Sequence, residues 1–230
     1  MAIEFNTVKW EDCDGIGLLQ LCRPPSNAMN RLFFTELSEL TAHIKNSGVK
    51  AIVITGSGRH FSSGADIANL LDATLEDVIT RTQPGNGLPD FLVQNNRSFS
   101  FFEQLKIPVI AAIKGVCLGS ALELALFAHF RFCGEGALLG LPEATFNLMP
   151  GCGASQTLPP LCGKAKAMEL ILTGANFSPA DAVAWGIADR IFPKKELVSA
   201  SLKFAAEIAE GYEKKLKPRY LKKYFPDGAS

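Results

Sequence analysis

The feature that most constrains the fold is an alternation of short apolar runs, glycine-containing turns and helical patterns. Runs at 16–24, 50–55, 108–115 and 187–193 are bounded by Gly or Pro, which is typical of strands. Apolar residues recur at helical spacing in 32–45, 163–174 and 178–186. Strands that alternate with helices predict an α/β fold with crossover connections.

The 230-residue chain contains no linker or strict repeat that would divide this alternation. We therefore expect one core domain over residues 1–194. The remaining segment, 195–230, is expected to form a short helical C-terminal appendage.

Composition excludes several classes of protein. Lys+Arg and Asp+Glu number 23 each, so net charge gives no pull toward nucleic acid or anionic lipid. The six cysteines show no C-x-x-C spacing, which argues against a metal site or a disulfide framework. The N-terminus lacks the apolar region of a secretory signal, and the longest apolar stretch, 116–130, is too short to span a membrane. We expect a soluble cytoplasmic protein with no membrane partner.

The segment LGSALELALF (118–127) places one carboxylate, Glu123, inside an apolar helical pattern. An ionised carboxylate is costly to bury without partners, so this glutamate needs a polar neighbour. Gly119 and a helix start near Ser120 would supply free backbone N–H groups at the positive end of a helix dipole. Spacing alone leaves two interpretations equally open: Glu123 faces a ligand there, or it closes a capping box with Ser120.

Two further glycine-bearing turns contain candidate polar groups. TGSGRHFSSGADI (55–67) fails as a dinucleotide motif, as a P-loop and as a nucleophile elbow. A tight turn at Gly64 would leave amides near Ala65 free to face an anion or an oxyanion, although an ordinary helix start explains them as well. Glu143, in the apolar stretch 138–159, would by itself be a solvent-exposed loop carboxylate. Two acids in apolar settings can instead divide acid and base roles.

Five segments in order resemble motifs of the crotonase superfamily, that of enoyl-CoA hydratases and isomerases. They are RPPSNAMN (23–30), IVITGSGRHFSSGADI (52–67), IPVIAAIKGVCLGSALELAL (107–126), LGLPEATFNLMPGCGASQTLPPLCG (139–163) and GIADRIFP (186–193). The resemblance runs from about residue 3 to about residue 210.

The resemblance implies a crotonase-like spiral of ββα units that adds water reversibly to a trans-2-enoyl-CoA. Coenzyme A would be part of the substrate, so no cofactor and no metal are implied. Backbone N–H groups of Ala65 and Ser120 would form an oxyanion hole for the thioester enolate. Glu123 would deprotonate water and Glu143 would protonate the α-carbon. The substrate-binding positions that it implies are Arg23, Asn27, Ala28, Gly64, Ala65, Asp66, Ile67, Ala68 and Gly119.

The resemblance also implies fatty acid metabolism and assembly as a homo-trimer or hexamer. Within the fold the alternative is a Δ3,Δ2-enoyl-CoA isomerase, which needs a single base, or a dehydratase or decarboxylase acting on an acyl thioester. The presence of both glutamates favours the hydratase. A non-enzyme alternative is nucleic-acid or lipid binding through the basic run 212–223, which a solvated helix face explains better.

The chain departs from the family pattern at four places. Ser120 stands where glycine is frequent, Asn147 replaces a glycine, and Ala68 stands where many members carry lysine. The C-terminal segment is shorter than the family's. The variable segment 69–105, rich in phenylalanine, is expected to determine which acyl chains fit.

Overall fold

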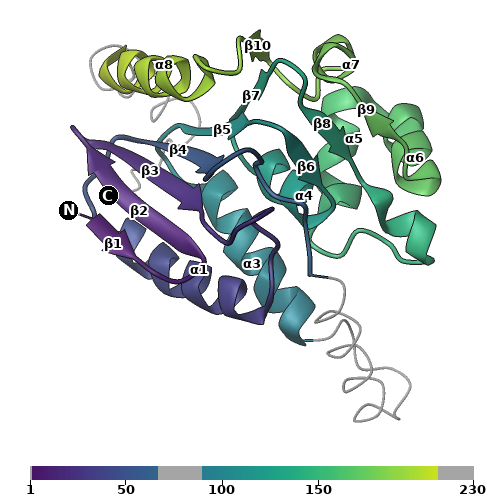
Figure 1. Cartoon of the computed structure of the whole chain (residues 1–230), viewed down its shortest axis with the longest axis horizontal. Helices are drawn as coiled ribbons and strands as arrows, with labels where there is room; N and C mark the ends of the chain where they lie inside the picture. Colours follow the sequence, from purple (N-terminus) through teal and green to yellow (C-terminus); the bar gives the residue numbers. More distant parts are fainter. Residues whose placement is uncertain (1, 67–89, 212–230) are drawn as a thin grey trace, which may run out of the picture.

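The structure is a computed structural model that describes residues 2–66 and 90–211 (Figure 1). Its main sheet has the strand order β1-β2-β3-β4-β5-β7-β10. The first two pairings are antiparallel and the rest are parallel. The strands are β1 (Ala2–Glu4), β2 (Val8–Cys13), β3 (Ile16–Leu21), β4 (Ala51–Gly56), β5 (Val109–Ile113), β7 (Phe130–Gly134) and β10 (Arg190–Phe192).

A second, three-stranded sheet has the order β6-β8-β9. Its strands are β6 (Val116–Leu118), β8 (Leu138–Gly140) and β9 (Asn176–Phe177). The helices are α1 (Arg31–Ile44), α3 (Asp90–Gln104), α4 (Ser120–Leu126), the 3₁₀ helix η1 (Pro142–Phe146), α5 (Ala154–Cys162), α6 (Lys164–Thr173), α7 (Pro179–Ala184) and α8 (Leu197–Gly211). The predicted α/β fold is confirmed.

The central parallel strands β4 and β5 are buried on both faces of the main sheet, as is typical of parallel strands. Ile52 and Ile54 of β4 point into the larger apolar cluster with α1, α3 and α4. Ala51 and Val53 of the same strand point into a second cluster under α8. In Figure 1, α1 and α3 lie on one side of the sheet and α8 on the other. The predicted boundary at residue 194 falls between β10 and α8, and the division into two units stays a prediction.

Helix α1 illustrates how local signals produce an element. The side chain of Asn30 caps it by accepting from the Phe33 amide. Phe33, Leu37 and Leu40 are each at most 2% exposed and recur at helical spacing, so one face of α1 packs on the sheet. Each such side chain contributes about 1.5–3 kcal/mol when it is removed from water.

Strand β10 is shorter than the predicted run 187–193. The amides of Ile187 and Ala188 bond to the Ala182 carbonyl, so these residues close the turn after α7 instead of extending the strand. The Asp189 amide donates to the Arg131 carbonyl at 2.8 Å, which starts the pairing with β7.

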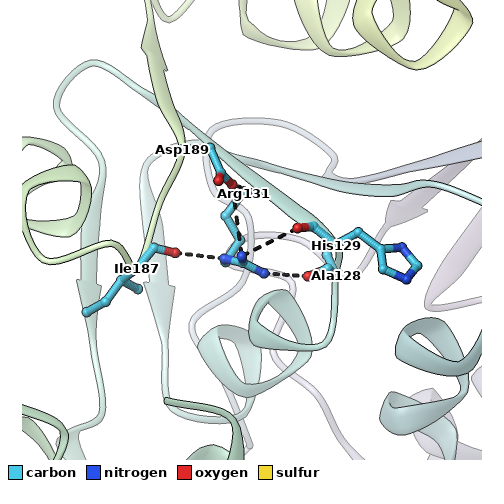
Figure 2. A network of polar contacts seen from close by, with 5 residues as sticks. All are labelled: Ala128, His129, Arg131, Ile187 and Asp189. Carbon is cyan, nitrogen blue, oxygen red and sulfur yellow. Dashed lines mark hydrogen bonds and ion pairs between the residues drawn. The ribbon is translucent and has the colours of Figure 1, made fainter. Parts of the chain in front are cut away.

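The buried side chain of Arg131 stabilises the junction between β7 and β10 (Figure 2). Its side chain is 6% exposed, and its guanidinium donates to the carbonyls of Ile187 at 2.7 Å, of His129 at 3.5 Å and of Ala128. The Arg131 amide donates to Asp189 Oδ2 at 2.7 Å. One buried side chain therefore satisfies carbonyls of two segments that are more than 50 residues apart.

Candidate active site

The turn that follows β4 is organised by Asn27. Its Nδ2 donates to the carbonyls of Ser57 and His60 at 3.0 Å, and to that of Phe61 at 3.1 Å. Its Oδ1 accepts from the Arg23 amide at 3.0 Å. The Asn27 side chain is 3% exposed and engaged within the protein, so it shapes the loop.

Three other predicted binding residues meet beside that turn. Arg23 forms an ion pair with Asp66, 3.0 Å between Nη2 and Oδ2, and donates to the Ala28 carbonyl at 3.1 Å. The predicted positions Ile67 and Ala68, and the basic run 212–223, lie outside the described residues.

The Gly64–Ala65 and Leu118–Ser120 segments touch. A Cβ on Gly64 would lie 2.4 Å from the Leu118 carbonyl oxygen and 3.5 Å from the Ser120 nitrogen, and Gly64 has φ +88°. Ala65 pairs with Met29 through the Gly64 carbonyl and the Asp66 amide, so its own N–H faces away from that bridge. Within residues 2–66 and 90–211, no acceptor takes the Ala65 or the Ser120 amide. The two predicted donors thus come from adjacent segments.

Helix α4 begins at Ser120 with Gly119 as its N-cap and no side-chain capping bond. The capping-box interpretation of Glu123 is therefore wrong. Gly119 has φ 52° and ψ −127°, a backbone conformation open essentially to glycine alone. A Cβ there would also lie 2.8 Å from Glu143 Oε1, so this glycine lets the Glu143 carboxyl approach the start of α4.

Glu123 is 1% exposed and sits beside the loop that leads into α5. Its Oε1 accepts from the amides of Cys152 at 2.8 Å and Ala154 at 3.0 Å. Its Oε2 is buried and has no partner among the described residues. Burial raises the pKa of Glu123, and the amide donors of Ala154 and Cys152 oppose that rise. The backbone thus fixes one carboxylate oxygen, and the other has no hydrogen-bond partner among the described residues.

Glu143 enters the same site from η1. Contrary to the solvent-exposed interpretation, it is half-buried, and its Oε2 is buried without a partner among the described residues. Burial, together with the neighbouring Glu123 charge, raises the pKa of Glu143 to about 7. Such a group is able both to donate and to accept a proton near neutral pH.

The residues after η1 explain one departure from the expected pattern. Asn147 adopts the left-handed conformation with φ 57°, which glycine and asparagine tolerate best.

The amide donors of Cys152 and Ala154 could not be predicted from the sequence, because a backbone N–H has no residue-type signature. The glycines around Cys152 were the only signal there.

Other site types find no support in the described ranges. Among residues 2–66 and 90–211, no group of three or more His, Cys, Asp or Glu side chains could hold a metal ion. All six cysteines are free. No helix in the described part of the chain has the length and apolar character needed to cross a membrane.

Comparisons with known proteins identify relatives of this chain. The family model for enoyl-CoA hydratase/isomerase matches residues 11–229. A probable mitochondrial enoyl-CoA hydratase of Dictyostelium discoideum is 35% identical, over 90% of this chain and 71% of that protein. The fatty acid oxidation complex subunit alpha of Shewanella amazonensis is 39% identical over 84% of this chain, but the match spans only 27% of that longer protein.

Solved structures agree with these matches. The enoyl-CoA hydratase of Bacillus anthracis superimposes with a TM-score of 0.79 at 29% identity, covering 88% of this chain and 76% of that one. The enoyl-CoA hydratase of Thermoplasma volcanium gives a TM-score of 0.78 at 28% identity, covering 90% and 78%. The chain therefore belongs to the enoyl-CoA hydratase/isomerase family and has the crotonase fold.

Proposed function

We propose that this protein is an enoyl-CoA hydratase, which adds water reversibly to the double bond of a trans-2-enoyl-CoA thioester. The observation that carries the proposal is the pair Glu123 and Glu143, whose carboxyl groups each keep one buried oxygen without a partner among residues 2–66 and 90–211. Unsatisfied buried oxygens are rare in proteins, and two in one site favour a ligand that bonds to both.

The two carboxyl groups suit opposite roles. Burial raises the pKa of Glu123, but the two amides that donate to Oε1 oppose that rise and favour the ionised form that a base requires. Glu143, with a pKa of about 7, is available in its protonated form at neutral pH. In the proposed step Glu123 takes a proton from water, and the water oxygen bonds to the β-carbon. The π electrons of the double bond shift to form an enolate, and Glu143 gives its proton to the α-carbon.

The amides of Ala65 and Ser120 would stabilise the enolate oxygen during that step. They belong to segments in contact, and neither has an acceptor within the described residues. Removal of a single oxyanion donor costs roughly 3–4 kcal/mol of transition-state stabilisation in other enzymes. In this proposal the coenzyme A group is part of the substrate, and no separate cofactor takes part.

A direct assay tests the proposal and separates it from isomerisation. Purified protein is mixed with short and long trans-2-enoyl-CoAs, and loss of the conjugated thioester absorbance is followed. In parallel, a 3-enoyl-CoA is offered and gain of that absorbance is followed. We expect loss with the first substrates. Gain with the second, together with no loss with the first, would make the protein an isomerase.

A further inference from the structure

The loop that holds Glu123 is itself held by a side chain from another helix. Asn96 of α3 donates from Nδ2 to the Cys152 carbonyl at 3.0 Å. The amide of the same residue, Cys152, donates to Glu123 Oε1 at 2.8 Å. Cys152 is thus held by two hydrogen bonds. Its carbonyl accepts from Asn96 of α3, and its amide donates to the Glu123 carboxylate.

Gly153 makes this approach possible. Its φ is +118°, and a Cβ there would lie 2.9 Å from Asn96 Nδ2 and 2.7 Å from Phe127 Cζ. Any larger residue would push Asn96 and the Phe127 ring away from the loop. The next residue, Ala154, starts α5 and supplies the second amide to Glu123, at 3.0 Å.

The Cys152 side chain closes the arrangement. It is 3% exposed, and its thiol contacts the Ser120 hydroxyl and the Glu123 carboxylate. Burial raises the pKa of this thiol well above its usual range, so it is protonated and serves as a packing group. Asn96 therefore borders a buried unit in which the position of one peptide decides where Glu123 points.

We propose that Asn96 is a positioning residue for Glu123, which keeps the Cys152 and Ala154 amides aimed at Oε1 and thereby leaves Oε2 directed to the substrate. This inference rests on the proposed function for its catalytic consequence. Its structural content, the dependence of Glu123 on Asn96, stands on the hydrogen bonds alone.

The test compares three variants on one helix. Asn96→Ala removes the donor, and Asn96→Leu removes it while keeping the volume, which guards against a folding failure. Gln94→Ala is the matched control, since Gln94 is an exposed polar residue two positions away. The primary readout is the ¹³C carboxyl titration of Glu123, assigned by its loss in Glu123→Gln, which requires no turnover.

We expect the Glu123 titration to move to higher pH in both Asn96 variants, because weaker amide donation favours the neutral form. The acid limb of the kcat profile should move with it, and kcat should fall about 10- to 100-fold at neutral pH while KM changes little. Gln94→Ala should match the wild type in every readout.

One result would overturn the positioning role of Asn96, and another would overturn the proposed function. An Asn96→Leu protein that is less stable, yet keeps the wild-type Glu123 titration and acid limb, would overturn the positioning role. A wild-type protein without hydratase activity, whose Glu123 titration still moves on Asn96 substitution, would support that role and overturn the proposed function.

Discussion

At the scale of single residues, Glu123 is almost completely buried, and its Oε2 has no hydrogen-bond partner in the part of the chain that the structure describes. Glu123→Gln keeps the size of the side chain but removes the base. Hydration should therefore fall by about 10²–10⁴-fold, the range of general acid–base groups. The control is Glu135→Gln, which changes an exposed glutamate and should leave turnover unchanged. Near-wild-type turnover in Glu123→Gln would mean that the two-carboxylate mechanism is wrong.

The raised pKa of Glu143 leads to a prediction for the pH dependence of hydration. Hydration requires this carboxyl in its protonated form, and burial places its pKa at about 7. The kcat/KM for hydration should therefore fall as the pH rises through about 7, because an ionised Glu143 has no proton for the α-carbon. Rates across pH 5–9, an interval of about two units on each side, provide the measurement. A profile that stays level well above neutrality would remove Glu143 from the role of acid.

The sequence was informative about this site only where function needs a particular side chain. Glu123 and Glu143 stand out because carboxylates in apolar settings are unusual. Asn96 does not stand out, since its partner lies 56 residues away and is a backbone carbonyl. The sequence placed Asn27 in a binding motif but did not predict its hydrogen bonds to the loop backbone. Their partners are carbonyls distant in sequence, so only the three-dimensional structure shows them.

At the scale of elements, the junction of β7 and β10 depends on Arg131 (Figure 2). Arg131→Met would leave the carbonyls of Ile187, Ala128 and His129 without their donor. We expect the free energy of unfolding to fall by about 3–5 kcal/mol, as when one partner of a buried polar cluster is removed.

The matched control for that variant is Arg190→Met, on the neighbouring strand. Arg190 is exposed and stacks on Phe204 with 4.7 Å between the guanidinium carbon and the ring centroid. Its loss should cost about 0.5–1 kcal/mol. Urea unfolding measures the free energy of unfolding of both variants. Equal decreases would show that the buried Arg131 hydrogen bonds stabilise the protein no more than the exposed Arg190 does.

Elements with strong local signals could be predicted and short ones could not. The predicted helical ranges 178–186 and 163–174 contain α7 and α6. Helix α7 begins with a reciprocal capping box of Ser178 and Asp181 and with Pro179 at the first helical position, and α6 ends before Gly174, which has the left-handed conformation. The strands of the second sheet have three residues or fewer, and such lengths carry no periodicity to read.

At the scale of the whole molecule, several exposed large apolar side chains lie on two elements that contact each other, η1 with the turn after it and α6. We call them together the η1–α6 surface; they are Phe146, Leu148, Met149, Met168 and Leu172. Met149 and Leu172 are 59% and 60% exposed. Contiguous apolar patches on monomers are usually small, so this surface favours an interface with another copy of the chain.

This surface leads us to predict a homo-oligomer, and the resemblance to the crotonase superfamily implies that it is a trimer or a dimer of trimers. Light scattering coupled to gel filtration should give three or six times 24.8 kDa. Leu172→Glu should reduce that mass, whereas Lys203→Glu should not, because Lys203 is an exposed residue of α8, which lies far from α6 in Figure 1. A single species of 24.8 kDa over a wide concentration range would exclude the oligomer.

The central claim is that Glu123 and Glu143 add water across a double bond, and deuterated solvent tests it most directly. The wild-type protein is incubated briefly with a trans-2-enoyl-CoA in D₂O, and the product is analysed by mass spectrometry and NMR. The mechanism predicts a saturated 3-hydroxyacyl thioester with one deuterium on the α-carbon, and no such product from Glu123→Gln or Glu143→Gln on the same timescale. An unhydrated thioester with a shifted double bond, or unchanged substrate, would contradict it.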